Sequence, residues 1–206
     1  MRRDPRDLQR YSAAERSNHW VVGICFILLG LSGLSLFHPL FFPLSALFGG
    51  GTWTRILHPF VGVLMAGAFL RMFVRFAGLN LLEAADWQWL GRVREMAGGE
   101  DQNMPAQGKY NGGQKILFWL LAACMLLLLL SGLPMWRAYF SLPVGTVRLA
   151  AVVHAAMAAL MIGAILVHVY AAIWVSGTVR AMLYGTVTRA WARQHHREWY
   201  RQVTGK

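Results

Sequence analysis

The sequence has little charge and few cysteines. Only 14% of its 206 residues are charged, whereas 56% are hydrophobic. A soluble domain of this length needs far more polar surface, so the composition predicts an integral membrane protein. The two cysteines, Cys25 and Cys124, lie inside apolar runs and outside any C-x-x-C motif. This excludes covalent haem attachment and a Cys-ligated cluster, and it predicts that both thiols pack as small apolar groups.

Acidic residues are also scarce, which leaves a formal net charge of +11. Such a charge could suit nucleic acid, but the Lys and Arg residues lie between and outside the apolar runs. A nucleic-acid-binding protein would carry them as a basic face on a soluble fold. We therefore expect membrane lipids, and no nucleic acid, among the partners.

Four apolar runs are each close to the ~20 residues that cross a bilayer as a helix. They cover about residues 20–37, 59–76, 116–133 and 149–175. The expected fold is all-α: an integral membrane four-helix bundle that forms a single domain over residues 1–206. Short interfacial helices are predicted in the middle loop, with Asp86 as N-cap before Trp87 and Trp89, and in the tail around Trp191 and Trp199.

The distribution of positive charge predicts the orientation. All but three of the 20 Lys and Arg residues lie in the N-terminal tail, in the last turn of the second run and the segment that follows it, or after the fourth run; the exceptions are Arg55, Arg137 and Arg148. Cytoplasmic loops carry the excess of positive charge. Both termini and the middle loop are therefore expected on the cytoplasmic side.

Four histidines lie in or at the ends of these runs, where an ionisable side chain is costly and usually functional. With this orientation His58 and His154 lie near the outer face, whereas His19 and His168 lie near the inner face. On one helix, His154 and His168 would be about 21 Å apart and within about 40° of the same side. The sequence predicts two bis-histidine metal centres at two depths.

Small residues follow each of these histidines by four positions, which is the next position on the same helix face. They are Gly23, Gly62, Ala158 and Ala172. A flat porphyrin needs such clearance, although small residues also serve helix–helix packing in membranes. Together with the depth pairing they favour haem b.

Other residues have simpler interpretations. His19 could be an interfacial polar residue, and His58 could only precede Pro59 at a helix start. His38 is expected at the interface, and His195 and His196 are expected to be solvated in the basic tail. Apolar packing is preferred to axial ligation for the methionines Met125, Met157 and Met161.

Several motifs closely resemble the cytochrome b (gamma) subunit of respiratory formate dehydrogenases, and the likeness covers nearly the whole chain. They are Asn18-His19-Trp20, residues 55–63 (RILHPFVGV), residues 109–115 (KYNGGQK), residues 167–174 (VHVYAAIW), Ser131-Gly132, Trp136-Arg137 and residues 191–196 (WARQHH).

The resemblance implies two haems b, one held by His58 and His154 and one held by His19 and His168. It implies a quinone pocket, for menaquinone or ubiquinone, formed by Asn111, Gly113 and Gln114 next to His168. It also implies an iron–sulfur beta subunit, a molybdenum- or tungsten-pterin alpha subunit that oxidises formate, a bacterial inner-membrane location and possible assembly of the complex into a higher oligomer. Electrons would enter at the outer haem and leave from the inner haem to the quinone.

Alternatives stay open. Within the same class, the chain could serve a nickel–iron hydrogenase or another quinone-linked oxidoreductase. A haem-free membrane anchor would leave the histidines idle, and a transporter would need acidic partners or broken helices that the spans lack. The loop at Asn111 could merely cap a helix, and Lys109 and Lys115 could bind lipid headgroups.

Overall fold

The computed structural model describes residues 7–98, 104–136 and 139–205, without the side chains of residues 96 and 97. Arg2, Arg3, Arg6, Arg137 and Lys206, which belong to the charge pattern above, lie outside the described residues. The chain divides into two compact units. The first unit comprises residues 1–16, 74–120 and 168–206, and the second comprises residues 17–73 and 121–167.

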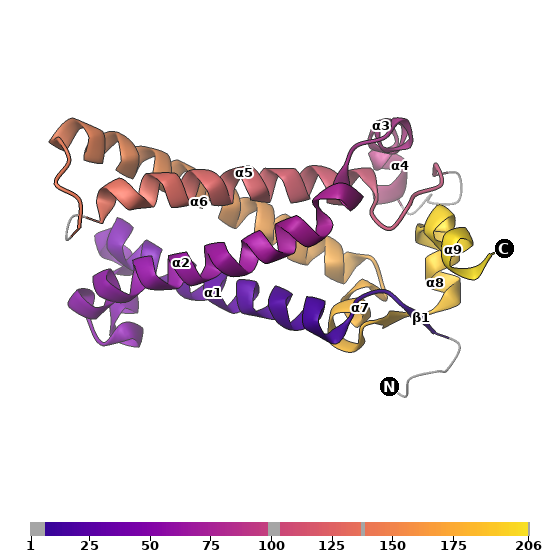
Figure 1. Cartoon of the computed structure of the whole chain (residues 1–206), viewed down its shortest axis with the longest axis horizontal. Coiled ribbons are helices and arrows are strands. Elements are labelled where there is room, and N and C mark those ends of the chain that lie inside the picture. The colour runs from indigo at the N-terminus through magenta and orange to yellow at the C-terminus, as the bar shows by residue number, and fades with distance from the viewer. Residues whose placement is uncertain (1–6, 99–103, 137–138, 206) are drawn as a thin grey trace. The chain divides into compact units, whose positions relative to one another are not determined.

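Four long helices occur in the predicted order (Figure 1): α1 (Ala13–Phe37), α2 (Gly51–Phe76), α5 (Gly112–Met135) and α6 (Val144–Trp174). Each is long and apolar enough to cross a membrane. Each helix begins several residues before the span that the sequence predicts, because the first turns contain polar residues that a hydropathy pattern does not include. In α1, for example, Ser12 and Glu15 cap the first turn reciprocally, with Glu15 N–H donating to Ser12 Oγ at 3.2 Å and Ser12 N–H donating to Glu15 Oε2 at 2.9 Å.

The second helix corrects one interpretation of His58. Pro59 lies inside α2, which begins at Gly51, so His58 is not the residue before a helix start. The 3-10 helix η1 (Pro39–Phe48) occupies most of the segment between α1 and α2 and ends at Gly49, whose φ of 86° favours glycine. At the start of η1, the Nδ1 atom of His38 accepts a hydrogen bond from Leu40 N–H at 3.2 Å.

In the second unit, side-chain contacts join neighbouring helices. Asn18 Nδ2 on α1 donates to Ala68 O on α2 at 2.9 Å, and the rings of Phe60 on α2 and Trp136 lie 5.2 Å apart. The buried side chains include Cys25, Cys124, Met125 and Met161. The two thiols and these methionines therefore pack in the interior, as predicted.

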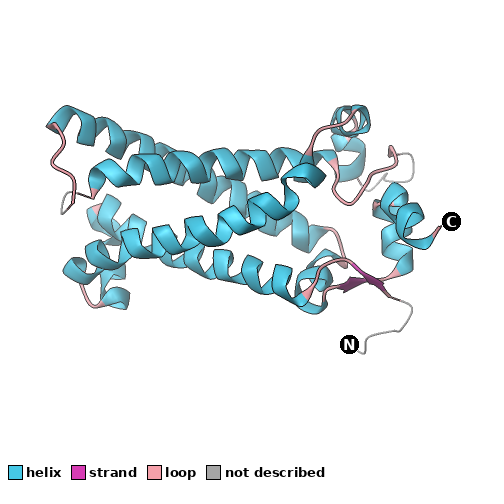
Figure 2. Cartoon of the chain, viewed as in Figure 1, coloured by secondary structure: helices cyan, strands magenta, loops and turns pink. Residues whose placement is uncertain are grey.

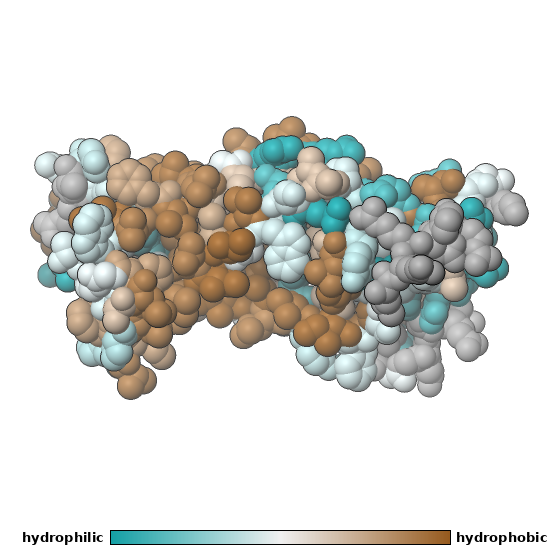
Figure 3. Space-filling view, turned by 90° about the horizontal axis from the view of Figure 1, so that it is seen from below, coloured by the Kyte–Doolittle hydropathy of each residue, from teal (hydrophilic) through white to brown (hydrophobic). Residues whose placement is uncertain are grey.

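Large apolar side chains cover the outward faces of the long helices. Ile24, Leu64, Leu126 and Val152 are all more than half exposed, and Figure 3 shows a broad hydrophobic surface on one side of the molecule. Exposed apolar surface of this extent marks a face that contacts lipid or another protein.

The first unit contains the two strands and the short α-helices (Figure 2). β1 (Leu8–Gln9) pairs antiparallel with β2 (Thr186–Val187), and the helices are α3 (Ala84–Gly91), α4 (Val93–Ala97), α7 (Thr178–Tyr184), α8 (Arg189–His195) and α9 (Arg197–Thr204), with the 3-10 helix η2 (Ala77–Asn80). A small core unites Val187, Trp191, Ala192 and Trp199 with Ala181. The tail is thus two helices around buried tryptophans, where the sequence predicted one surface helix.

Helix α3 corrects two further predictions. Its N-cap is Glu83, whereas Asp86 is the third helical residue, and Asp86 Oδ2 accepts the Glu83 N–H at 2.7 Å. The same oxygen lies 2.7 Å from Lys115 Nζ, and both side chains are buried. Lys115 therefore forms an internal ion pair, which takes its ammonium away from lipid headgroups.

Candidate functional site

Two of the four predicted ligands meet in the second unit. The ring centres of His58 on α2 and His154 on α6 lie 6.2 Å apart, with 65° between the ring planes. An imidazole nitrogen lies about 2.0–2.1 Å from the metal ion it binds and about 1.1 Å from its own ring centre, so two imidazoles on opposite sides of one ion have centres about 6.3 Å apart. The observed separation fits two imidazoles that would hold one metal ion.

A hydroxyl group contacts each of these rings on the side of Nδ1. Ser32 Oγ on α1 lies 2.7 Å from His58 Nδ1, and Ser131 Oγ on α5 lies 3.1 Å from His154 Nδ1. Occupation of Nδ1 leaves Nε2 of each ring as the nitrogen available to a metal.

The site provides two ligands and no more from the described residues, because no group of three or more His, Cys, Asp or Glu side chains gathers there. A closed structural metal site requires about four protein ligands. Two imidazoles alone suit an ion whose remaining positions are filled by a macrocycle, as in a haem with two axial histidines.

The small residues predicted to give clearance are all half-buried. A Cβ atom added at Gly23 would meet nothing within 4 Å, and one at Gly62 would meet only Leu29 Cδ2, at 3.9 Å. Space therefore remains beside both glycines. Ala158 and Ala172 lie on α6, four residues after His154 and His168.

The second predicted pair is divided between the two units. His19 is a half-buried residue of α1 in the second unit, and its ring lies 6.0 Å from that of Trp20. His168 is half-buried near the C-terminal end of α6, in the first unit. Their pairing stays a prediction from the sequence.

The loop predicted to bind quinone begins α5 and caps it. Gln114 N–H donates to Asn111 Oδ1 at 2.9 Å, and Asn111 N–H donates to Gln114 Oε1 at 3.1 Å. This reciprocal pair has the form of a capping box, which was the alternative interpretation of the loop. Both bonds use the carbonyl oxygens, and the two NH₂ groups take no part in them. Gly113 lies against Trp89, whose ring would be 3.0 Å from an added Cβ.

The segment before this loop is held by both ends of the chain. Gln107 O accepts the N–H groups of Glu198 and Trp199 at 3.1 and 3.4 Å. His196 Nδ1 donates to Gly108 O at 2.8 Å, and Arg10 donates to Lys109 O. Three consecutive carbonyls are thus fixed directly before Tyr110 and Asn111.

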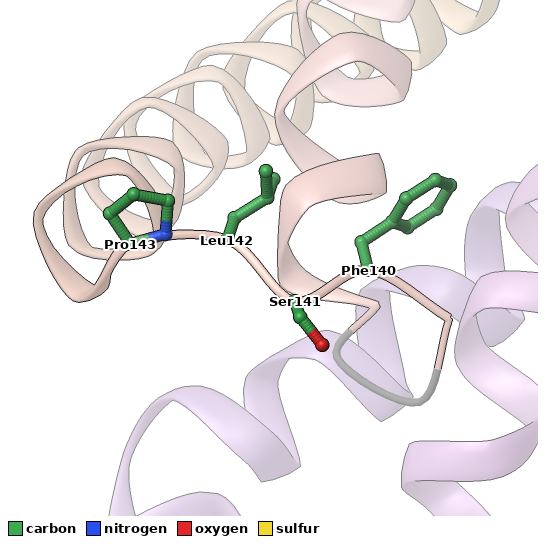
Figure 4. A pocket seen from close by; sticks show the side chains of 4 residues that line it. All are labelled: Phe140, Ser141, Leu142 and Pro143. Carbon is green, nitrogen blue, oxygen red and sulfur yellow. The ribbon is translucent and has the colours of Figure 1, made fainter.

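A shallow hollow of about 420 Å³ lies at the start of α6 (Figure 4), lined by Phe140, Ser141, Leu142 and Pro143. These four residues include no titratable side chain and none of the predicted site residues. The hollow therefore adds nothing to the candidate site.

Comparison with known proteins identifies the family of the chain. The family model described as "Prokaryotic cytochrome b561" matches residues 10–185. The chain belongs to this cytochrome family. Four apolar helices and this family together make it a multi-pass membrane protein with a helical bundle fold.

Curated relatives of this cytochrome are named as formate dehydrogenase subunits. The "Formate dehydrogenase, cytochrome b556(fdo) subunit" of Escherichia coli (strain K12) is 44% identical over 198 residues, which cover 94% of this chain and 92% of the relative. The nitrate-inducible cytochrome b556(Fdn) subunit of the same strain is 41% identical over 92% of this chain and 88% of the relative. A Haemophilus influenzae cytochrome b556 subunit is 38% identical over 94% and 82%. The resemblance seen in the sequence motifs is confirmed.

The sequence does not reveal two features of this cytochrome. One is the contact of Ser32 and Ser131 with His58 and His154, for which the only signal is that both serines belong to an identical Leu-Ser-Gly-Leu string. His196 was expected to be solvated but is only 2% exposed. Burial, together with the adjacent Arg10 guanidinium, holds the pKa of His196 well below its usual range.

Burial also shifts the pKa of the two residues before Asn111. Burial lowers the pKa of Lys109, against the opposing effect of Glu15. Its ammonium lies 4.9 Å from the centre of the Tyr11 ring, so it faces aromatic rings in the first unit. Burial also raises the pKa of Tyr110, which keeps this phenol neutral.

Proposed function

We propose that the chain is the membrane cytochrome b subunit of a formate dehydrogenase, and that it carries electrons from an iron–sulfur subunit to a membrane quinone. The names of its relatives support the formate dehydrogenase assignment. In this proposal the iron–sulfur beta subunit contacts a molybdenum- or tungsten-pterin alpha subunit, where formate is oxidised. The complex would lie in the bacterial inner membrane, with both termini of this chain in the cytoplasm.

The separation of the His58 and His154 rings is the observation that carries the proposal, because 6.2 Å suits two imidazoles that would together hold one iron. His58 and His154 would hold the outer haem b through Nε2, whereas His19 and His168 would hold the inner one. The two haems, when bound, would supply one-electron carriers at two depths in the membrane. Gly23, Gly62, Ala158 and Ala172 would leave room for them beside the helices.

The quinone would bind at the start of α5. Asn111 and Gln114 keep NH₂ groups outside their mutual capping bonds, and these groups can donate to a quinone carbonyl. The tethered carbonyls of Gln107, Gly108 and Lys109 fix the position of Asn111. Because the positive-inside bias predicts a cytoplasmic location for this loop, the protons for quinone reduction would come from the cytoplasm.

Haem stoichiometry tests the proposal. We expect about two b-type haems per chain in reduced-minus-oxidised spectra of the purified complex, as bis-histidine ligation by four histidines requires. His58→Ala and His154→Ala should each remove the same haem and leave the other, whereas His168→Ala should remove the other one. His38→Ala is the matched control, because His38 is a histidine of the second unit that caps η1. Absence of a b-type band in the wild-type complex would refute the proposal.

Co-purification distinguishes the donor. An iron–sulfur subunit and a pterin subunit that oxidises formate should accompany the tagged chain from solubilised membranes. Co-purification with a nickel–iron hydrogenase would instead mean that the chain is a cytochrome whose electron donor is hydrogenase. Purification without haem would favour a membrane anchor.

A further inference from the structure

We propose that Ser32 and Ser131 are positioning residues that orient the two ligands of the outer haem and set its reduction potential. The inference rests on the proposed function, since it concerns His58 and His154 as iron ligands. It begins from a geometry that occurs twice: a buried serine of one helix contacts Nδ1 of a histidine on the next long helix of the chain.

The direction of each hydrogen bond follows from the proton count. Ser32 Oγ lies 2.7 Å from Leu28 O, and Ser131 Oγ lies 2.6 Å from Leu127 O. A carbonyl oxygen has no proton, so the single hydroxyl proton of each serine is donated to its carbonyl. The contact with the histidine therefore requires a proton on Nδ1, which the histidine donates to the serine.

This fixes the tautomer of both rings. With Nδ1 protonated, the lone pair of each neutral imidazole resides on Nε2. Each ring is thereby prepared to bind iron through Nε2 before haem arrives. A hydrogen bond at the distal nitrogen also raises the basicity of a metal-bound imidazole.

The glycine after each serine allows the ring to approach. A Cβ atom at Gly33 would lie 3.3 Å from His58 Cε1, and one at Gly132 would lie 3.4 Å from His154 Cε1. Each imidazole is thus bounded by the hydroxyl and by the bare backbone of one Ser-Gly dipeptide. This is a physical reason for the repetition of Leu-Ser-Gly-Leu at residues 31–34 and 130–133.

Loss of either hydroxyl should favour the ferrous state, because a more basic imidazole stabilises ferric iron. In Ser32→Ala and Ser131→Ala we expect the ratio of ferric to ferrous outer haem at a given potential to fall about tenfold. For a one-electron couple this is a rise of about 59 mV in the reduction potential. The effect should be larger for Ser32, whose contact with Nδ1 is 2.7 Å against 3.1 Å for Ser131.

The test is a potentiometric titration of both haem bands in the intact complex, with the low-spin ferric EPR signal recorded alongside. Only the outer haem should shift, and its EPR anisotropy should change because the angle between the ligand planes is no longer fixed. Ser35→Ala is the matched control: Ser35 is equally buried on α1, but its Oγ donates to Ser32 O. It should leave both potentials unchanged.

Ser32→Thr retains a hydroxyl and should retain the wild-type potential. If Ser32→Ala loses the outer haem altogether, retention of that haem in Ser32→Thr and Ser35→Ala supports the same role. Wild-type potentials and EPR spectra in both serine-to-alanine variants would overturn the inference, as would an equal shift in Ser35→Ala. Absence of haem from the wild-type complex would instead overturn the proposed function on which it rests.

Discussion

The buried ion pair between Asp86 and Lys115 should stabilise the attachment of α3 to the first turn of α5. Lys115 Nζ lies 2.7 Å from Asp86 Oδ2, and the two side chains are 6% and 2% exposed. The helices are also in close contact at Gly112, where an added Cβ would lie 2.7 Å from Asp86 O. Removal of one charge leaves the other buried without its partner.

Lys115→Met should therefore lower the free energy of unfolding by about 3–5 kcal/mol, and Asp86→Asn should have a comparable effect. The double variant should recover most of the loss, because neither charge then remains buried. The pair of Arg75 and Glu15, 2.9 Å apart with side chains 62% and 15% exposed, is the control. Because the Arg75 side chain is 62% exposed, Arg75→Met should cost less than about 1 kcal/mol.

Unfolding of the purified complex in detergent, followed by tryptophan fluorescence, measures these differences, since Trp89 lies in α3 beside the pair. The wild type, the two single variants and the double variant form a double-mutant cycle, which gives the coupling energy between Asp86 and Lys115. Two results would refute the reasoning. One is a cost below about 1 kcal/mol for both single variants, which would mean that water screens the pair. The other is a double variant as unstable as the sum of the single ones.

Two further predictions concern the loop that begins α5 and the buried His196, which is hydrogen-bonded to the segment before that loop. Asn111→Ser retains a side-chain acceptor for Gln114 N–H but removes the NH₂ group, so quinone reduction should slow while stability stays unchanged. Asn111→Ala should in addition lose about 1 kcal/mol of stability from the helix cap. Unaltered quinol formation in Asn111→Ser would leave the loop with a capping role alone. Because the folded pKa of His196 is depressed, its contribution to stability is complete above about pH 6.5 and falls by about 1.4 kcal/mol per pH unit below it. His196→Gln should flatten the acid limb of the stability curve, and a curve parallel to that of the wild type would contradict this assignment.

The sequence alone predicts the long helices well, because a membrane span has a strong compositional signal. It fails at their polar ends. Pro59 predicts a helix start at that residue, whereas α2 begins at Gly51 and continues through the proline. The type of Asp86 predicts an N-cap at that position, whereas the N-cap is Glu83, three residues earlier, and Asp86 pairs with Lys115, 29 residues later in the chain.

The first unit was the least predictable part of the chain. The sequence predicts only that Arg10 belongs to the positively charged N-terminal tail, that Lys109 can bind lipid headgroups and that His196 is solvated. In the structure Arg10 is 5% exposed and its guanidinium lies 5.0 Å from the ring centres of both Trp191 and Trp199. Aromatic rings can accept a cation in this way, but no local pattern connects residue 10 with residues 191–199.

The outer pair of histidines illustrates what sequence spacing can and cannot determine. Hydropathy and charge bias predict one depth for His58 and His154, and in the structure the centres of their rings lie 6.2 Å apart. Depth alone does not choose which nitrogen of a ring faces the metal. That choice depends on hydroxyl groups 26 and 23 residues away along the chain. If each serine has already committed its proton to a backbone carbonyl, the two rings need no tautomer exchange when iron binds. The residues that orient the predicted ligands therefore belong to α1 and α5, the two long helices that supply neither of these ligands.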